Sequence, residues 1–598
     1  MAYATGSVNP LTPNTPMSEA QEVLDTAVAN QPKKRGCWRG CLILFLIFAL
    51  LFWWFCIHSA PLRFSEETVY VLQPMTDKGY IDYLKALEER YYPPEMKTDN
   101  NGYRLFVRQF GLVDSYVPAE DREFYRVQTY EKLGLDPGIP TTFVFPDLPV
   151  KVFKDFYEAR GEEIPEHFFT NPSFYGREKR DVSEDHWQRP WTLEEFPMLA
   201  NWIKDIDAPL DAIAEAVSKP VFFPPLLHTL ESVQSETPKD LLGTRLPHVQ
   251  TLRTAAKMFQ ARAMYRIARG DIDGALDDKL TLYRLGRHIS PNSFIVQHLV
   301  GIALESAAAT IPIGGNSEHQ PTREQVQRVL DGLDALPPRA SSHDAYEFER
   351  FVGLSVLQEI RHGRSLYDYT YLGEGERKID PYEMMLRAYI ASCDWNVVYR
   401  RVREMYDALQ TMPPQAFETM IKEMEFQVRR DLFLQVFTAR SRGTTFAKMF
   451  TALFMPAVSA YHDAAQRSEC AENIQRLTLA LLLYEKEHGT LPGGDWVKAI
   501  TPYLGEHGER YFSCPSNPSP PGETTYRLVQ HSEGVPMEPD AILLVEQISP
   551  VPFNKAVIPI EDVLPLGEWH QRQPLPHGQR TNVSRRSGAV RFLAVNMP

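Results

Sequence analysis

The sequence has few cysteines and no excess of positive charge, and each shortage excludes a class of protein. Six cysteines among 598 residues cannot build the dense disulfide framework of a small secreted domain. The 63 lysines and arginines are outnumbered by 77 aspartates and glutamates, which gives a net charge of −14. Because a nucleic-acid-binding protein presents a basic surface, we expect no nucleic-acid partner.

Motifs of well-known catalytic sites are also missing. The sequence has no Walker loop and no G-x-G-x-x-G, the motifs that hold nucleotide phosphates. The Glu487-His488 pair is not part of the H-E-x-x-H motif of zinc proteases. The adjacent Asp277 and Asp278 fit the solvated face of a helix better than a metal site. We therefore expect a non-enzymatic protein with no catalytic residues, no cofactor and no bound metal.

The overall composition is that of a globular protein. Apolar residues make up 43% of the chain and charged residues 23%, so neither global disorder nor a collagen-like repeat is expected. At about 150 residues per domain, a chain of this length is expected to form about three to four folded units, or two large ones.

A single long apolar run lies near the N-terminus. Residues 41–57 contain no charged side chain and no polar amide, and with residues 40 and 58–60 the run approaches the about 20 residues of a transmembrane helix. Basic residues crowd positions 33–39, so the positive-inside rule places the N-terminal side in the cytoplasm. A cleaved signal peptide is the alternative, but about forty residues precede the run and no cleavage site is clear.

This run therefore predicts a single-pass protein of the cytoplasmic (inner) membrane in type II orientation. Residues 1–39 are expected to form a disordered cytoplasmic tail, because they are rich in small and polar residues. Residues 40–60 are expected to contact the lipid bilayer, and the bulk of the chain is expected in the periplasm.

The part after residue 60 divides into regions by its local patterns. Residues 61–240 mix short helical patterns with loops rich in proline and aromatic residues. Residues 241–442 are strongly helical, and Ala263, Tyr265, Gly270 and Ala275 resemble one tetratricopeptide hairpin. Because no second copy follows at a period of about 34 residues, we interpret it as an isolated helical hairpin. Further helices are predicted near residues 294–310, 322–335, 343–361, 380–411 and 414–436.

Residues 443–598 change to an α+β pattern. One long helix carries an apolar stripe that includes Ile474, Leu477 and Leu481, and Gly489 suits the left-handed cap that ends it. Strand-like runs follow at residues 525–529, 541–545 and 589–595, separated by loops. The predicted fold is a mainly α region with an α+β C-terminal module, behind one N-terminal transmembrane helix.

Three segments of this module carry a recognisable pattern. Residues 453–492 run from L-F-M-P-A-V to H-G-T-L-P, Cys514-Pro515-Ser516 follows, and in the tail nine residues separate His577 from Ser587-Gly588. These segments resemble planctomycete type II secretion pseudopilin-like proteins with an H-x9-D-G tail. Ser587 replaces the aspartate of that tail. The matching residues include Pro456, Asn473, Tyr484, Gly489, Pro492, His577, Asn582, Gly588 and Phe592.

The resemblance implies a pilin-like fold, used here in an unusual position. A pilin begins with a processing site and a long apolar helix, whereas residues 443–454 retain only about ten apolar residues, too few to span a bilayer. We therefore expect a fixed pilin-like module rather than a polymerising pilin. Residues 277–287, 300–303 and 394–398 resemble membrane-anchored planctomycete proteins of unknown function, so no activity follows from them.

Cys470 and Cys514 are the only two cysteines of this module. In an oxidising periplasm we expect them to form a disulfide. Two unpaired cysteines in the core are the alternative, because free cysteine packs as a small apolar residue.

These features together predict an interaction or assembly module at the cell envelope, in the context of secretion or surface structures. Its expected partners are other envelope proteins, and no pattern specifies an oligomeric state. A membrane-anchored envelope hydrolase with its site in residues 65–240 is the alternative. A filament subunit processed near Gly443 is a third class.

Overall fold

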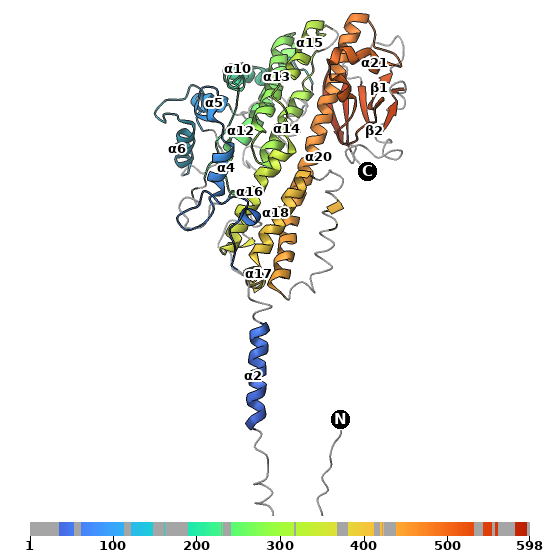
Figure 1. Ribbon diagram of the computed structural model, residues 1–598. Helices are drawn as coiled ribbons and strands as arrows, with labels where there is room; N and C mark the ends of the chain where they lie inside the picture. The colour runs from blue at the N-terminus through green and yellow to red at the C-terminus, as the bar shows by residue number, and fades with distance from the viewer. Residues whose placement is uncertain are drawn as a thin grey trace, which may run out of the picture.

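A computed structural model shows an elongated helical molecule with a small sheet at one end (Figure 1). The predicted tail over residues 1–39 lies outside the described residues as far as residue 34. The structure describes residues 35–52, 61–112, 121–146, 161, 189–228, 230, 241–315, 318–366, 381–411, 419–420, 423, 438–530, 542–552, 556–559, 580–585 and 587–594.

The first described helix, α2, spans Arg35–Phe52 and has 18 residues. Arg35 and Arg39 lie near its start. Within the described ranges, none of the helices combines the length and the apolar character that crossing a membrane requires. The prediction of a single-pass transmembrane helix over residues 40–60, with its type II orientation, is therefore wrong.

Five short helices and one of 21 residues, α10, make up most of the described part of residues 61–228, where the sequence predicts a mixed pattern. Asp82 and Asn101 begin two of these helices, because their side chains accept hydrogen bonds from the amides of Lys85 and Tyr103. Asn101 also donates to the carbonyl of Phe223, which ties the two ends of this region together. The helices are α3 (Glu66–Val69), α4 (Tyr83–Tyr91), η2 (Pro94–Lys97), α5 (Gly102–Phe110), α6 (Arg122–Leu133) and α10 (Pro197–Val217).

In the described residues between 247 and 411, seven helices of 11 to 22 residues form the middle of the molecule, which we call the helical body. The predicted hairpin is present: Gly270, with a φ of 79°, makes the turn, and the Asp271 side chain caps the second helix. Thr322 and Gln325 form the predicted capping box. The helices are α12 (Pro247–Ala268), α13 (Ile272–Ile289), α14 (Ile295–Thr310), α15 (Arg323–Asp334), α16 (Ser342–Arg361), α17 (Pro381–Ala391) and α18 (Trp395–Thr411).

The prediction of one helix over residues 380–411 is wrong, because the chain breaks between α17 and α18. The amide of Asp394 donates to the carbonyl of Ala439 (2.9 Å), and its side chain accepts from the amide of Asn396 (3.0 Å). A Cβ added to Gly443 would lie 2.7 Å from the carbonyl oxygen of Asp394, so the two segments touch here. A contact with a distant segment therefore sets the break. The helix predicted over 414–436 lies mainly outside the described residues.

One helix, α20, runs for 50 residues from Ala439 to His488. It begins with a capping box between Thr438 and Ser441. It ends at Gly489, whose φ of 78° gives the left-handed cap that the sequence predicts. At about 1.5 Å per residue, this single helix is about 75 Å long.

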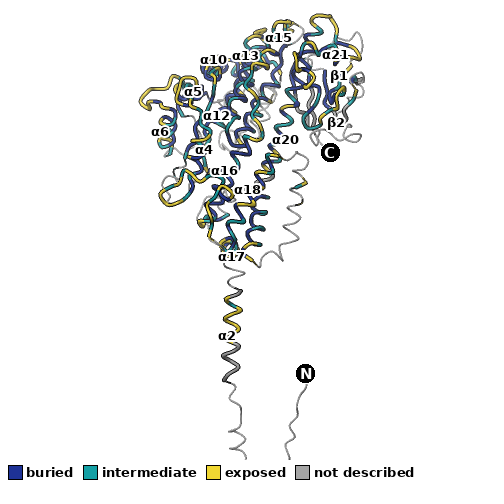
Figure 2. The backbone as a smooth tube through the Cα atoms, viewed as in Figure 1, coloured by how far each residue is buried: buried dark blue, intermediate teal, exposed yellow. Residues whose placement is uncertain are grey.

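Helix α20 contributes to two hydrophobic cores, one at each end. Phe446 and Tyr461 are buried in a core with residues of α16 and α18. Ile474 and Leu481 are buried in a second core, which also contains residues from α5, α12, α13 and the sheet. Figure 2 shows this burial along the inner sides of the helices. The second core joins residues of all three predicted regions after residue 60, so these regions share one interior.

A five-stranded sheet packs on the C-terminal half of α20 (Figure 1). Its strand order is β3-β1-β2-β4-β5, with every neighbouring pair antiparallel except β1 and β3, which are parallel. The strand-like runs of the sequence correspond to β1, β2 and β5, whereas β3 and β4 were not predicted. The described chain is thus mainly helical with an α+β end. The strands are β1 (Glu523–Gln530), β2 (Ile542–Pro552), β3 (Val557–Pro559), β4 (Arg580–Arg585) and β5 (Val590–Ala594).

Candidate functional site

A pocket of about 830 Å³ lies where the helical body meets the C-terminal module. Its walls come from the connection between α15 and α16, from α20 between His462 and Arg476, and from residues 510–515 that precede the sheet. This position is outside residues 65–240, where the alternative hydrolase site was predicted. The pocket has a size typical of small-ligand sites, about 300–1,000 Å³.

Buried ion pairs form the inner side of this pocket. Glu472 of α20 is approached by three guanidinium groups, from Arg287, Arg339 (2.8 Å) and Arg476 (3.1 Å). Arg339 also pairs with Glu305 at 2.7 Å, and Arg287 pairs with the same carboxylate at 3.3 Å. These charges come from α13, α14, α20 and the loop before α16, so the network joins the elements that surround the pocket.

The network gives Glu472 an unusual acidity. Burial alone raises the pKa of Glu472, but the guanidinium groups of Arg339, Arg287 and Arg476 outweigh it and lower the pKa from 4.5 to about 2. A carboxylate with a lowered folded pKa stabilises the protein above its unfolded pKa, and the contribution disappears as the pH falls through the folded pKa.

Replacement of Glu472 by glutamine is therefore expected to flatten the loss of stability between about pH 4.5 and pH 2. The wild-type carboxylate is expected to contribute about 2–3 kcal/mol above this window, which the variant lacks. The measurement is the urea midpoint of each protein across that pH range. Glu506→Gln, at an exposed site, is the control and should follow the wild type. Parallel curves for Glu472→Gln and wild type would contradict the prediction.

The aromatic ring of Tyr511 lies on the outer side of the pocket and contacts two guanidinium groups. The guanidinium carbons of Arg476 and Arg510 lie 4.9 and 4.7 Å from the ring centre of Tyr511. Arg510 also donates to the Tyr511 hydroxyl at 2.6 Å. Arg510 is exposed and forms no ion pair with a carboxylate of the described residues, although its charge acts on Glu469 from a greater distance. Its remaining N–H groups are available to a ligand.

Three polar residues of α20 face the pocket along successive turns. Gln466 donates to the ring of His462 (2.8 Å), whose pKa is lowered by burial. Glu469 also lines the pocket, and burial raises the pKa of its carboxyl group, although the charges of Arg339, Arg287 and Arg510 act against the rise. In the described part of the chain, no basic side chain lies within ion-pair distance of Glu469. This carboxyl group is therefore open to a ligand.

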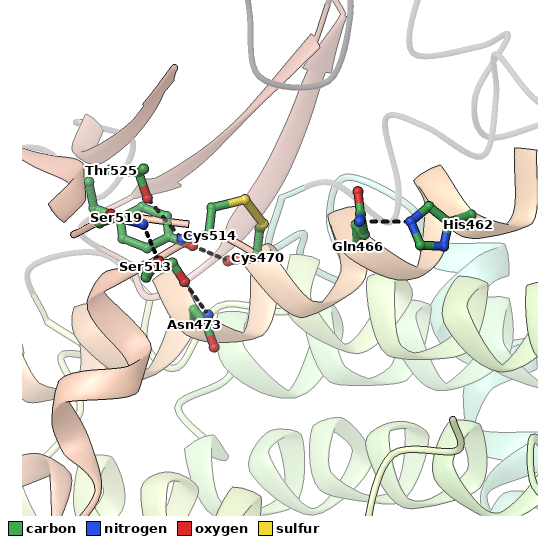
Figure 3. The surroundings of a disulfide bond; sticks show 9 residues. His462, Gln466, Cys470, Asn473, Ser513, Cys514, Ser519 and Thr525 are labelled. Atoms are coloured by element: carbon green, nitrogen blue, oxygen red, sulfur yellow. Dashed lines mark hydrogen bonds between the residues drawn. A yellow bond between two sulfur atoms is a disulfide. The ribbon is translucent and has the colours of Figure 1, made fainter. Parts of the chain in front are cut away.

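The disulfide between Cys470 and Cys514 joins two walls of the pocket (Figure 3). The two cysteines that the sequence analysis proposed as a pair thus lie bonded, with 5.2 Å between their Cα atoms. Cys470 follows Glu469 on α20, and Cys514 lies between two other lining residues, Ser513 and Pro515. Because neighbours of both cysteines line the pocket, the disulfide fixes its width.

Among the described residues, one group of side chains has the composition of a metal site: the buried carboxylate of Glu546 and the two cysteines of the disulfide. The Glu546 carboxylate and both sulfur atoms lie within 4.8 Å of one another. Because the two sulfurs are bonded to each other, they are not thiolate ligands, and the arrangement is not a metal site.

The residues matched to the family motif mostly support the junction around α20. Asn473 lines the pocket and donates to the carbonyl of Ser513 at 3.1 Å. Tyr484 stacks on His488 with ring centres 4.0 Å apart. Of the remaining motif residues, Pro456 lies within α20, Gly489 caps it, Pro492 is buried just after it, and His577 lies outside the described residues.

The turn between β4 and β5 docks on the helical body. The carbonyl of Ser587 accepts from the amide of Ile313 (2.8 Å), and the carbonyl of Gly588 accepts from the side chain of Gln475 (2.8 Å). Asn582 and Phe592 pair across the two strands. The turn at Ser587-Gly588 therefore forms a contact between the C-terminal module and the helices.

Gly588 offers a direct test of this docking. Its φ is +75°, and an added Cβ would lie 2.5 Å from Cγ1 of the buried Ile313. Gly522 has a similar φ of +83° but open space around it. We expect Gly588→Ala to lower the free energy of unfolding by about 1–2 kcal/mol more than Gly522→Ala, because only the former adds a clash to the backbone strain. Urea denaturation measures both, and equal losses would show that the turn is not tightly docked.

Sequence reasoning did not find the arginine network or the pocket. Glu472 and Arg476 have the four-residue spacing of a helical ion pair, which is the one local signal present. The other partners, Arg287, Glu305 and Arg339, come from distant segments. No family model, curated protein or solved structure matches this chain, so these residues are interpreted from their geometry alone.

Proposed function

We propose that this protein is a non-enzymatic interaction or assembly module of an oxidising compartment such as the cell envelope. Its proposed binding site is the pocket between the helical body and the C-terminal module, which we call the junction pocket. The observation that carries this proposal is the pocket of about 830 Å³ between the helical body and the α+β C-terminal module. A link to secretion or surface structures rests on the resemblance of that module to pseudopilin-like proteins.

The firm attachment of the module supports a fixed role rather than polymerisation. A pilin subunit needs a free apolar helix to enter a filament. The corresponding helix here is α20, whose N-terminal half is buried against α16 and α18. The disulfide and the docked turn at Gly588 attach the sheet to the same helix and body. The disulfide also favours a compartment outside the reducing cytosol.

The chemistry of the pocket favours binding over catalysis. Catalysis needs a nucleophile, a base and an orienting group within mutual reach. The carboxylate of Glu472 is occupied by three guanidinium groups, and so is not free to act as a base. The Ser341 hydroxyl group accepts a hydrogen bond from the amide of Asp344 in the first turn of α16, and the Ser513 hydroxyl group accepts one from the amide of Ser519. The described lining residues thus offer no complete catalytic set.

The test is affinity purification of the full-length protein with in-cell cross-linking, comparing two variants. Ala340→Trp places a large side chain in the lining of the pocket, whereas Ala388→Trp makes the same change on the exposed face of α17. A partner that mass spectrometry recovers with wild type and Ala388→Trp, but not with Ala340→Trp, would support the proposal. Identical partner sets for all three proteins would exclude the pocket as the binding site.

A further inference from the structure

We infer that the junction pocket takes an extended peptide segment of a partner protein, with a basic side chain at Glu469 and an acidic side chain at Arg510. This inference rests on the proposed function and specifies its ligand. It follows from three features of the pocket: the ion pairs that its charged side chains form, its apolar walls, and the arginines that lie on its Tyr511 ring.

The charges of the pocket are paired except at two points. Arg287, Arg339 and Arg476 are each bound to carboxylates. Glu469 and Arg510 line the same pocket from opposite walls, α20 and the loop before the sheet. Neither forms an ion pair with a described residue, although the charges of Arg339, Arg287 and Arg510 act on Glu469 from a greater distance. A ligand that carries both a cation and an anion would complement them, and an ion of a single charge would leave one unmatched.

The remaining surface suits a peptide backbone with small apolar side chains. Pro337, Pro338, Ala340, Ala465 and Pro515 provide apolar walls on three sides. Gln466 uses its amide nitrogen on His462 and keeps its carbonyl oxygen available for a backbone N–H group. A few placed polar groups on apolar walls are the usual composition of a ligand pocket.

An uncharged oligosaccharide fits these features less well. Sugar rings are commonly held by stacking on an aromatic face, and Tyr511 is the one aromatic ring among the described lining residues besides the imidazole of His462. Two guanidinium groups already lie on the Tyr511 ring. A sugar would also leave the charges of Glu469 and Arg510 unpaired.

The experiment uses the purified full-length, disulfide-bonded protein and pools of N-acetylated, C-amidated octapeptides. Four pools differ only in fixed residues: one lysine and one aspartate, lysine alone, aspartate alone, or neither. We expect the pool with both charges to be retained about tenfold more than the neutral pool, the scale of a charged hydrogen bond. Glu469→Gln should remove the preference for lysine, and Arg510→Gln should remove the preference for aspartate.

Matched controls separate this ligand from general electrostatics. Glu506→Gln and Lys498→Gln change exposed charges that do not line the pocket, and they should bind the pools as wild type does. Equal retention of all four pools, or a charge preference that survives both pocket substitutions, would overturn the inference. If the peptides fail while Ala340→Trp still abolishes recovery of a cellular partner, the pocket binds another class of ligand and the proposed function stands. If Ala340→Trp has no effect in cells either, both fail.

Discussion

Replacement of Asp278 by alanine is expected to lower the free energy of unfolding by about 3–4 kcal/mol, because it leaves a buried guanidinium group without its main partner. Asp278 and Arg262 are 1% and 2% exposed. They form a two-point ion pair, with the Asp278 oxygens 2.6 and 3.2 Å from Nη2 and Nε of Arg262. Arg266 adds a third contact at 3.0 Å.

Both partners carry charge near neutral pH. Burial raises the pKa of Asp278 to about 6, which is still below 7, while Arg262 and Arg266 oppose the rise. The carboxylates of Asp278 and Asp211 hold the pKa of Arg262 above its usual value, although burial acts against them. The remaining contacts of Arg262, with Asp207 and Asp211, involve exposed carboxylates and compensate only in part.

The neighbouring residue supplies the control for this experiment. Asp277 is exposed and pairs with Arg328 on the surface, so Asp277→Ala should cost less than about 1 kcal/mol. Urea denaturation followed by circular dichroism measures both variants. A loss below about 1 kcal/mol for Asp278→Ala would show that the helical body relaxes around the unpaired arginine, contrary to the prediction.

Removal of the disulfide is the second change with a large expected effect. The bond between Cys470 and Cys514 closes a loop with a sequence separation of 44 residues. Its loss in the Cys470→Ser, Cys514→Ser double variant is expected to destabilise the C-terminal module by about 4 kcal/mol, since the unfolded chain regains conformational freedom. Both cysteines are fully buried, so the serine hydroxyl groups add a further cost.

Hydrogen exchange followed by mass spectrometry is the measurement best suited to this change. Faster exchange is expected in β1 and in residues 462–488 of α20, while α12 and α13 should keep their protection. A chemical control comes first: alkylation of the non-reduced, unfolded protein should modify Cys393, which is free in the described part of the chain, and spare Cys470 and Cys514. Modification of all three would contradict the disulfide itself.

Elements whose ends are set by neighbouring residues were predictable from the sequence. The Gly270–Asp271 turn, the capping box at Thr322 and the cap at Gly489 depend on side chains within a few positions of the helix end. The structure places each of them where local chemistry indicates. The three apolar runs that became β1, β2 and β5 are likewise visible as strand-length segments.

Features set by contacts between distant segments were not predictable in this way. Asp277 and Asp278 look alike in the sequence. Asp278 alone is buried, where it pairs with Arg262 of the preceding helix. The break at Asp394 depends on Ala439, and the pocket depends on an arginine network drawn from several helices. Strand β4, with charged residues at both ends, lacks an apolar run and gains its place by pairing with β2 and β5.

The unbroken course of α20 has a mechanical consequence. Both ends belong to one helix, so a load applied at Ala439 reaches the pocket along α20, through the single turn where Pro456 removes a backbone hydrogen bond. Glu469 lies thirty residues along this rod, which sets its reach at about 45 Å. The length of α20 would therefore set the distance between a ligand bound beside Glu469 and the N-terminal end of the helix.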